Sequence, residues 1–138
     1  MSLFNIFDIS GAGMSSQTLR LNLTASNMAN AETMAATPEQ AYKARQPVFA
    51  ATLQAIRGGG EQAVAPQVRA VVESKAETTA LHMPHHPMAD AQGYVYRSNV
   101  NSVEEMVNMM SASRSYQNNV EVMNTSKEML LQTLRLGS

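Results

Sequence analysis

The 138-residue sequence contains no cysteine and no tryptophan, and aromatic residues make up only 5% of it. Without cysteine there is no disulfide framework and no thiolate chemistry, so cysteine usage leaves the cellular compartment open. Hydrophobic residues still reach 44%, and 11 of them are methionines. This composition favours adaptable packing of flexible side chains over a rigid aromatic core.

Charge is also scarce, at 15% of residues with a formal net charge of −1. A nucleic-acid-binding protein usually presents a basic face, so the balance argues against that class. No apolar run approaches the ~20 residues that span a bilayer, and we expect no membrane-spanning segment. The first cation is Arg20, so the N-terminus lacks the basic region of a usual secretory signal peptide.

The pattern of residues 99–137 predicts one long helix without internal proline or glycine. Ser102 and Glu105 have the spacing of a capping box at its start. Arg135 lies in the last turn, where the helix dipole favours a cation, and Gly137 is placed to end the helix. At about 1.5 Å per residue such a helix is roughly 50 Å long, which is too long for one side of a compact globule of this size.

The apolar residues of this helix form a seam with alternating spacings of three and four, which is the coiled-coil pattern. The nine seam positions are Met106, Met109, Ser113, Tyr116, Val120, Met123, Lys127, Leu130 and Leu134. Between Met106 and Ser126 the only charged residues are Arg114 and Glu121. A helix with one face in water normally carries more charge than this. We therefore expect neighbouring helices to cover much of its surface.

Residues 5–30 predict a second helix, with Asn5 as N-cap and Gly11 and Gly13 weakening its first turns. Its three-four stripe comprises Phe4, Phe7, Met14, Leu21, Ala25 and Met28. Between Ile9 and Ala31 the only charged residue is Arg20. This helix therefore also lacks a charged face, and we expect both helices to order fully only on assembly.

A polar row with a spacing of four residues also follows this helix, at Asn22, Ser26 and Asn30. Simple solvent exposure would explain it. The scarcity of charge favours hydrogen bonding that sets the register between packed helices.

The middle of the chain differs in composition, because it holds all five prolines and all three histidines. Residues 42–49, 64–74 and 93–96 predict short strands, and residues 58–63 predict a flexible turn. Residues 48–57 could continue as strand or helix. The predicted fold class is thus mainly α: an antiparallel, coiled-coil-like pair of end helices (residues 1–33 and 99–138) with a small irregular β-containing insert (residues 34–98).

Candidate catalytic and metal-binding patterns are weak. His82, His85 and His86 lie in a segment broken by prolines, which prevents the helical spacing that places two imidazoles on one metal. The Gly58–Gly60 run lacks the Lys-Ser or Lys-Thr that follows in a phosphate-binding loop. No nucleophile elbow accompanies the serines. We expect no enzyme activity, no metal and no cofactor.

Several segments resemble one family. Residues 19–31, LRLNLTASNMANA, resemble the N-terminal motif of bacterial flagellar axial proteins, which build the rod, the hook and the hook–filament junction. Residues 105–125 resemble the C-terminal block of the proximal-rod members of that family, and so do YKARQPVF at residues 42–49 and PMADAQGYV at residues 87–95.

The resemblance implies a structural, non-catalytic subunit whose end helices pack side by side in the tube of the flagellar rod. The rod crosses the periplasm, transmits torque and forms part of the export channel used for motility. The implied partners are copies of the chain, other rod proteins and the flagellar type III export apparatus, which would export it without a cleaved signal.

The residues expected to pack between subunits are Leu21, Asn22, Ala25, Ser26, Met28, Asn30, Met106, Met109, Tyr116, Val120, Met123, Leu130 and Leu134. Two alternatives stay open for function: another rod subunit of the same family, or a free-standing coiled-coil adaptor. The His82–His86 loop has no assigned role.

Overall fold

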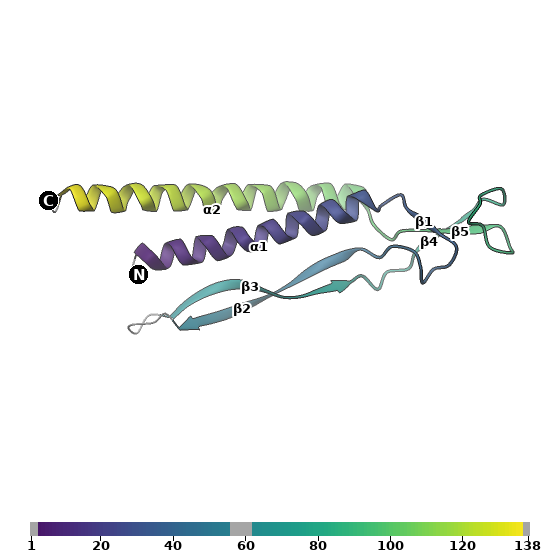
Figure 1. The fold of residues 1–138 in the computed structure, drawn as a ribbon, viewed down its shortest axis with the longest axis horizontal. Coiled ribbons are helices and arrows are strands. Elements are labelled where there is room, and N and C mark those ends of the chain that lie inside the picture. The colour runs from purple at the N-terminus through teal and green to yellow at the C-terminus, as the bar shows by residue number, and fades with distance from the viewer. Residues whose placement is uncertain (1–2, 56–61, 137–138) are drawn as a thin grey trace.

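The computed structural model describes residues 3–55 and 62–136 (Figure 1). The predicted turn at residues 58–63 lies outside the described residues except for Gln62 and Ala63, which belong to a strand and not to a turn. The predicted helix end at Gly137 also lies outside the described residues. The elements follow in the order α1 (Leu3–Ala29), β1 (Met34–Ala35), β2 (Arg45–Ala55), β3 (Gln62–Glu73), β4 (Thr79–His82), β5 (Tyr94–Arg97) and α2 (Ser102–Leu136).

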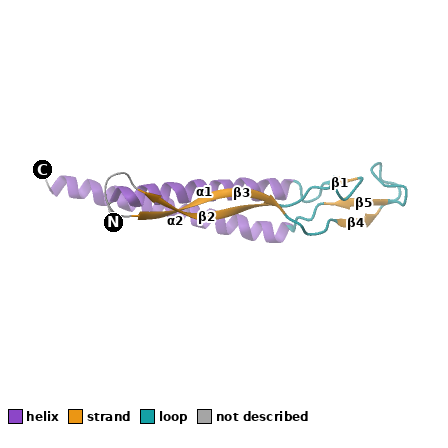
Figure 2. Ribbon diagram, turned by 90° about the horizontal axis from the view of Figure 1, so that it is seen from below, coloured by secondary structure: helices purple, strands orange, loops and turns teal. Residues whose placement is uncertain are grey.

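The molecule is a long, narrow body in which α2, α1 and the β2–β3 hairpin lie side by side (Figures 1 and 2). The chain runs along α1, returns through the middle segment and runs back along α2, so the two helices are antiparallel (Figure 1). A three-stranded sheet of order β1-β5-β4 lies at the end farthest from the termini. We call the segment from β4 through β5 the tip.

The predicted fold class is wrong. The middle of the chain is not a small irregular insert, because it forms two antiparallel sheets. The β2–β3 hairpin has strands of 11 and 12 residues, which at about 3.3 Å per residue makes it nearly as long as α1. α1 contacts both α2 and this hairpin. It is therefore the middle layer of a mixed α and β body and not one half of a two-helix coiled coil.

The register of the hairpin determines which residues share a face. Pairs Pro47–Val71 and Phe49–Val68 lie on one face, and pairs Gln46–Val72 and Val48–Ala70 lie on the other. A bulge between Val48 and Phe49 shifts the register. Pro47 and Val68 are half-buried, and the hydroxyl of Ser16 on α1 donates to the carbonyl of Pro66 at 3.0 Å. The first face therefore packs on α1.

The contact between α1 and α2 is made by small and polar side chains. A Cβ added to Gly13 would lie 2.8 Å from Nδ2 of Asn119, so the absence of a side chain at Gly13 lets the helices approach. On α2, the buried residues Glu105, Ala112 and Ser126 continue the same line as Asn119, with spacings of seven. This line of small or polar residues is the side of α2 that faces α1.

Asn27 joins the C-terminal end of α1 to the start of β2. Its side chain is 1% exposed. Its Nδ2 donates to the carbonyl of Arg45 at 2.9 Å, and its Oδ1 accepts from the N–H of Arg45 at 2.9 Å and from the hydroxyl of Tyr42 at 3.0 Å. Asn27 thus pairs with the backbone of Arg45 as a neighbouring strand would, and it fixes where the hairpin leaves the helix.

Asn99 makes a matching connection just before α2. Its Oδ1 accepts from the N–H of Ala44 at 2.7 Å, and its Nδ2 donates to the carbonyl of Ala76 at 2.8 Å. The N-cap of α2 is Asn101, whose Oδ1 accepts from the N–H groups of Val103 and Glu104 at 3.1 and 3.4 Å. The predicted capping box of Ser102 and Glu105 is therefore wrong, because Ser102 is already the first residue of the helix and Asn101 before it is the N-cap.

The tip is organised by Asp90. Its Oδ1 accepts from the N–H groups of Gln92 and Tyr94, both at 2.8 Å, and the hydroxyl of Tyr96 donates to its Oδ2 at 3.4 Å. The N–H of Tyr94 is the largest influence holding the pKa of Asp90 below its ordinary value, and burial opposes it. Gly93 follows with φ +81°, a backbone conformation that glycine adopts without strain.

The two glycines of α1 give a matched test of the helix contact. A Cβ at Gly11 meets nothing within 4 Å, whereas one at Gly13 meets Asn119. Gly11→Ala should therefore raise the free energy of unfolding by about 1 kcal/mol through helix propensity. Gly13→Ala should gain less or lose stability because Asn119 must move. Thermal unfolding followed by circular dichroism measures both, and equal stabilisation would contradict the close contact.

Replacing Asn27 should detach the hairpin. Asn27→Ala leaves the N–H and carbonyl of Arg45 without their side-chain partner in a partly buried position, at a cost of up to roughly 1–3 kcal/mol for each group. Amide exchange at Arg45 should accelerate strongly. Asn22→Ala is the control, because Asn22 is exposed on the same helix and should change exchange little. Unchanged protection at Arg45 in the Asn27 variant would refute this role.

The tip should loosen in acid. The pKa of Asp90 is lower in the folded tip than in the unfolded chain, so its carboxylate stabilises the turn above the unfolded value of about 3.9. That stability is lost as the pH falls through the lowered pKa. Amide protection of Gln92 and Tyr94 should be constant from neutral pH down to about 5 and should decrease below about 4. Asp90→Asn should abolish this pH dependence, and its persistence in that variant would exclude Asp90 as the cause.

Candidate assembly interface

The described residues bury small side chains and expose large ones. Apart from Val95, the buried hydrophobic residues are all alanines, and buried polar residues such as Asn5, Ser16 and Thr24 outnumber the hydrophobic ones. The exposed large hydrophobic residues include Val48, Phe49, Val71, Val72, Met83, Met88, Tyr94, Val103, Met106, Val107, Met110, Tyr116, Val122, Met129, Leu131, Leu134 and Leu136. An isolated subunit with this distribution leaves many large apolar side chains substantially exposed to water, which is typical of interaction surfaces.

The predicted seam of α2 lies beside the line that faces α1 and not on it. Residues at i+1 and i+4 from Glu105, Ala112, Asn119 and Ser126 fall on one flank of the helix. They are the first eight seam positions, and Leu134 continues the same flank one turn further on. Met109, Val120, Met123 and Leu130 are half-buried. Met106 and Tyr116 are exposed, and Leu134 is 64% exposed. The seam is therefore a mostly apolar flank of α2 that the chain itself covers only in part.

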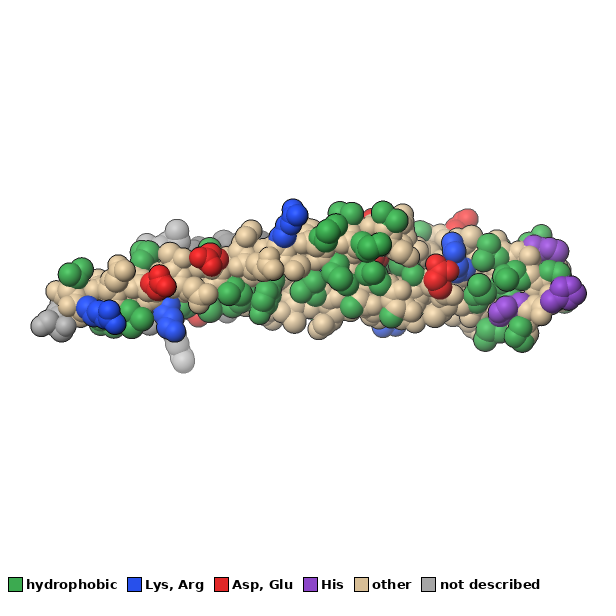
Figure 3. Space-filling model, turned by 90° about the horizontal axis from the view of Figure 1, so that it is seen from above, with side chains coloured by type: hydrophobic (Ala, Val, Ile, Leu, Met, Phe, Trp, Pro, Cys, Tyr) green, Lys and Arg blue, Asp and Glu red, His purple; other side chains and the backbone are tan. Residues whose placement is uncertain are grey.

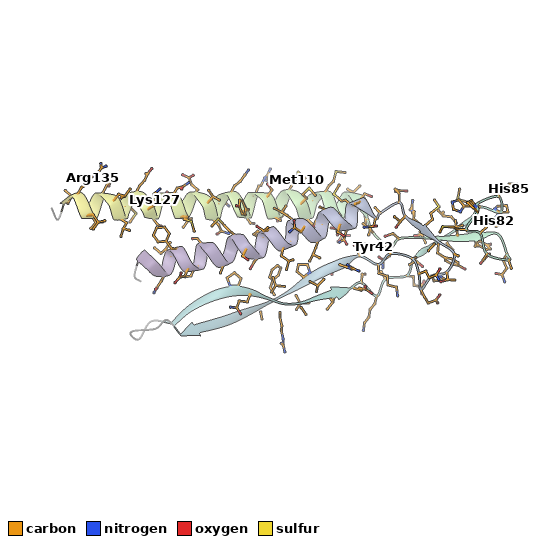
Figure 4. The ribbon with its side chains drawn as sticks, viewed as in Figure 1. Tyr42, His82, His85, Met110, Lys127 and Arg135 are labelled. Carbon is orange, nitrogen blue, oxygen red and sulfur yellow. The ribbon has the colours of Figure 1, made fainter. Side chains whose placement is uncertain are left out.

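A second exposed apolar group covers the first turns of α2. Val103, Val107 and Met110 follow at helical spacing, with Met110 56% exposed. Figure 4 shows Met110 on the side of α2 away from α1, and Figure 3 shows hydrophobic side chains gathered over this part of the helix. Together with the start of the seam they extend the apolar surface around the N-terminal part of α2.

Four charged residues of α2 lie on its outer side. Arg114, Glu121, Glu128 and Arg135 are spaced by seven residues, and all are exposed. Each of them lies two residues after a position on the line that faces α1, so their side chains point almost directly away from α1. We call these four residues the outer line. Lys127 is the one charged residue of the seam. The outer line is therefore the water-facing side of α2, and the apolar seam separates it from α1.

The predicted packing residues of α1 fall into two groups. Leu21 and Met28 are half-buried, and Asn22 and Ala25 are exposed. Ser26 and Asn30 make hydrogen bonds within the chain: Asn30 Nδ2 donates to the carbonyl of Ser26 at 2.8 Å, and the Ser26 and Tyr42 hydroxyls lie 3.3 Å apart.

The strongest polar anchor, Asn27, was absent from the prediction. Asn27 does not belong to the row of polar residues at Asn22, Ser26 and Asn30, and its hydrogen-bond partners at Tyr42 and Arg45 come together with it only in the folded chain.

The histidines of the tip are engaged locally or point outward. His82 packs edge-on against Tyr94 with ring centroids 5.1 Å apart, and Nδ1 of His86 accepts from the N–H of Met88 at 3.1 Å. Across residues 3–55 and 62–136 no group of three or more His, Cys, Asp or Glu is arranged to hold a metal ion. Within those same residues, neither helix combines the length and hydropathy needed to cross a membrane.

The C-terminal part of the chain matches a known protein family. The family described as "Flagellar basal body rod FlgEFG protein C-terminal" matches residues 91–136, which include β5 and α2. The chain is also similar along its length to curated proteins called flagellar basal-body rod protein FlgC. Those of Salmonella typhimurium strain LT2 and Escherichia coli O157:H7 are 48% and 50% identical over 137 residues, and each alignment covers 99% of both chains.

A more distant relative, from Buchnera aphidicola subsp. Acyrthosiphon pisum, is 38% identical over 140 residues and is again covered to 99%. Identity at this level over whole chains shows more than a shared helix motif. The chain belongs to the FlgC family of flagellar basal-body rod proteins.

Proposed function

We propose that the chain works as a structural subunit of the flagellar basal-body rod and that the α2 seam packs against neighbouring subunits. Family membership supports the role in the rod. The single observation that supports the packing role is the exposed part of the seam, at Met106, Tyr116 and Leu134, because a coiled-coil pattern that the chain covers only in part calls for a helix from outside.

The residues of α2 proposed to pack between subunits all belong to the seam. Met106, Met109, Tyr116 and Val120 lie in its N-terminal half, and Met123, Leu130 and Leu134 lie in its C-terminal half. Covering them would remove apolar area from water at about 25 cal/mol per Å². On α1, Leu21, Asn22, Ala25 and Met28 are available in the same way, whereas Ser26 and Asn30 contribute by shaping the end of that helix.

The proposal extends to position and delivery. We place the subunit in the proximal rod, in the periplasm, as part of a helical tube that transmits torque and surrounds the export channel. Export through the flagellar type III apparatus requires a chain that unfolds readily. A core of alanines, Val95 and hydrogen-bonded polar groups buries little apolar area, which supports such a route.

A charge in the seam should block incorporation. Val120→Asp places a carboxylate where a neighbouring helix is expected, so the variant should be non-motile and absent from purified basal bodies. Asn118→Asp is the matched control, because Asn118 is exposed near the outer side of α2 and should leave swimming unchanged. Both purified variants should keep the circular dichroism of the parent chain.

Normal swimming with Val120→Asp would contradict the seam assignment. Recovery of the parent chain only as a discrete soluble oligomer, never in basal bodies, would instead favour a free-standing coiled-coil adaptor.

A further inference from the structure

The β2–β3 hairpin has one long edge that the chain leaves unpaired. Among the described elements, β2 contacts only β3 and α1. Figure 1 shows the two strands crossing, so that in the half of the hairpin farther from the tip β3 lies nearer α1 and β2 is the outer strand. The hollow between α1 and the hairpin agrees with this arrangement, because its hairpin side is lined only by Pro66, Gln67 and Val68 of β3.

The hydrogen bonds of the hairpin show which backbone groups point out of this edge. In an antiparallel pair, hydrogen-bonded residues alternate with residues whose N–H and C=O groups point away from the partner strand. Arg45 is of the second kind, because its backbone binds Asn27. Ala51 is too, because its partner Pro66 has no N–H and directs its carbonyl to Ser16. With a two-residue period, the outward-facing residues in this half of β2 are Phe49, Ala51, Leu53 and Ala55.

The two strands of the hairpin differ in how their edges are protected. Proteins protect exposed strand edges with prolines, charges or bulges. β3 has all three, because Pro66 lacks an N–H, Arg69 is the extra residue at the bulge, and Glu73 forms an ion pair with Arg45 at 3.8 Å. Residues 49–55 of β2 contain no proline, no charged residue and no break in register. We call residues 49–55 the free edge; such an edge is a template for a strand from another chain.

We infer that two copies of the chain, before incorporation into a rod, pair through their free edges as antiparallel strands about a twofold axis at Thr52. No other described strand fits this edge, because β3 is protected and β1, β4 and β5 have only two to four residues. Pairing about Thr52 places Phe49 opposite Ala55 and Ala51 opposite Leu53 of the second copy. Every outward N–H and C=O group of these four residues then has a partner.

The paired sheet is closed to further strands. Its order is β3-β2-β2-β3, so both of its outer strands are the protected β3. The contact is isologous and stops at a dimer, whereas an unprotected outer strand would continue to add chains. In the tube proposed above all copies point in one direction, so a twofold pair cannot persist there. The dimer therefore covers the free edge before incorporation and separates when the subunit joins the rod.

Cysteine cross-linking tests this register, because the chain has no cysteine. Thr52 faces its own copy in a non-hydrogen-bonded pair with Cα atoms about 4.5 Å apart, which is within the range that a disulfide spans. Full-length Thr52→Cys, purified and mildly oxidised, should form disulfide-linked dimers several-fold above the level of Ala65→Cys. Ala65 is the matched control because it pairs with Thr52 in the hairpin and lies one strand farther from the free edge.

A proline in the free edge provides the second measurement. Ala51→Pro removes an outward N–H that the β2–β3 ladder does not use, and Pro47 already occupies an outward position of the same strand. Analytical ultracentrifugation should show a concentration-dependent dimer for the parent chain and a monomer for Ala51→Pro, with unchanged circular dichroism. Val64→Pro, at an outward position of β3, should still dimerise.

Four results would each overturn the inference. They are a parent chain that stays monomeric at all concentrations, equal cross-linking of Thr52→Cys and Ala65→Cys, an Ala51→Pro chain that dimerises like the parent, and Thr52→Cys disulfides between subunits of purified basal bodies. The last result would place the contact in the rod and not before incorporation.

Discussion

The close approach of α1 and α2 is the constraint on which the rest of the structure depends. Gly13 has no side chain, and one added there would meet Asn119 at 2.8 Å. Ala112 and Ser126 continue this narrow contact along α2. No large apolar residue of α2 lies on this line, and the methionines, valines and leucines of the helix lie on its other sides. The fold within one chain thereby leaves its large apolar side chains for contacts between chains.

The hairpin is the second consequence of this arrangement. With α2 on one side and β2–β3 on another, α1 is covered on two sides by its own chain, which accounts for part of the scarcity of charge between Ile9 and Ala31. Sequence reasoning assigned that cover to neighbouring subunits. Asn22 and Ala25 remain exposed. Asn27 holds the layers together, because one buried amide satisfies both backbone groups of Arg45 and the hydroxyl of Tyr42.

The sequence predicts the elements better than their partners. Heptad spacing locates α2 and its seam, since side-chain periodicity follows directly from helix geometry. It does not reveal that Glu105, Ala112, Asn119 and Ser126 form the intrachain contact, because small and polar residues give no apolar signal. The strands were underestimated because β2 and β3 contain several alanines and one proline each, and both residue types are depleted in strands. The role of Asn27 depends on a residue 18 positions away, and no local pattern encodes that.

The central claim is that the seam is open in the free chain and covered in the rod. Met106→Cys places a thiol in the exposed part of the seam, and Glu121→Cys places one on the outer line. The direct measurement is the rate of maleimide labelling of each thiol in the purified chain and in basal bodies. The account predicts that Met106→Cys labels rapidly when free and is protected in the rod, while Glu121→Cys labels in both. Equal labelling of Met106→Cys in the two states, or protection already in the free chain, would contradict it.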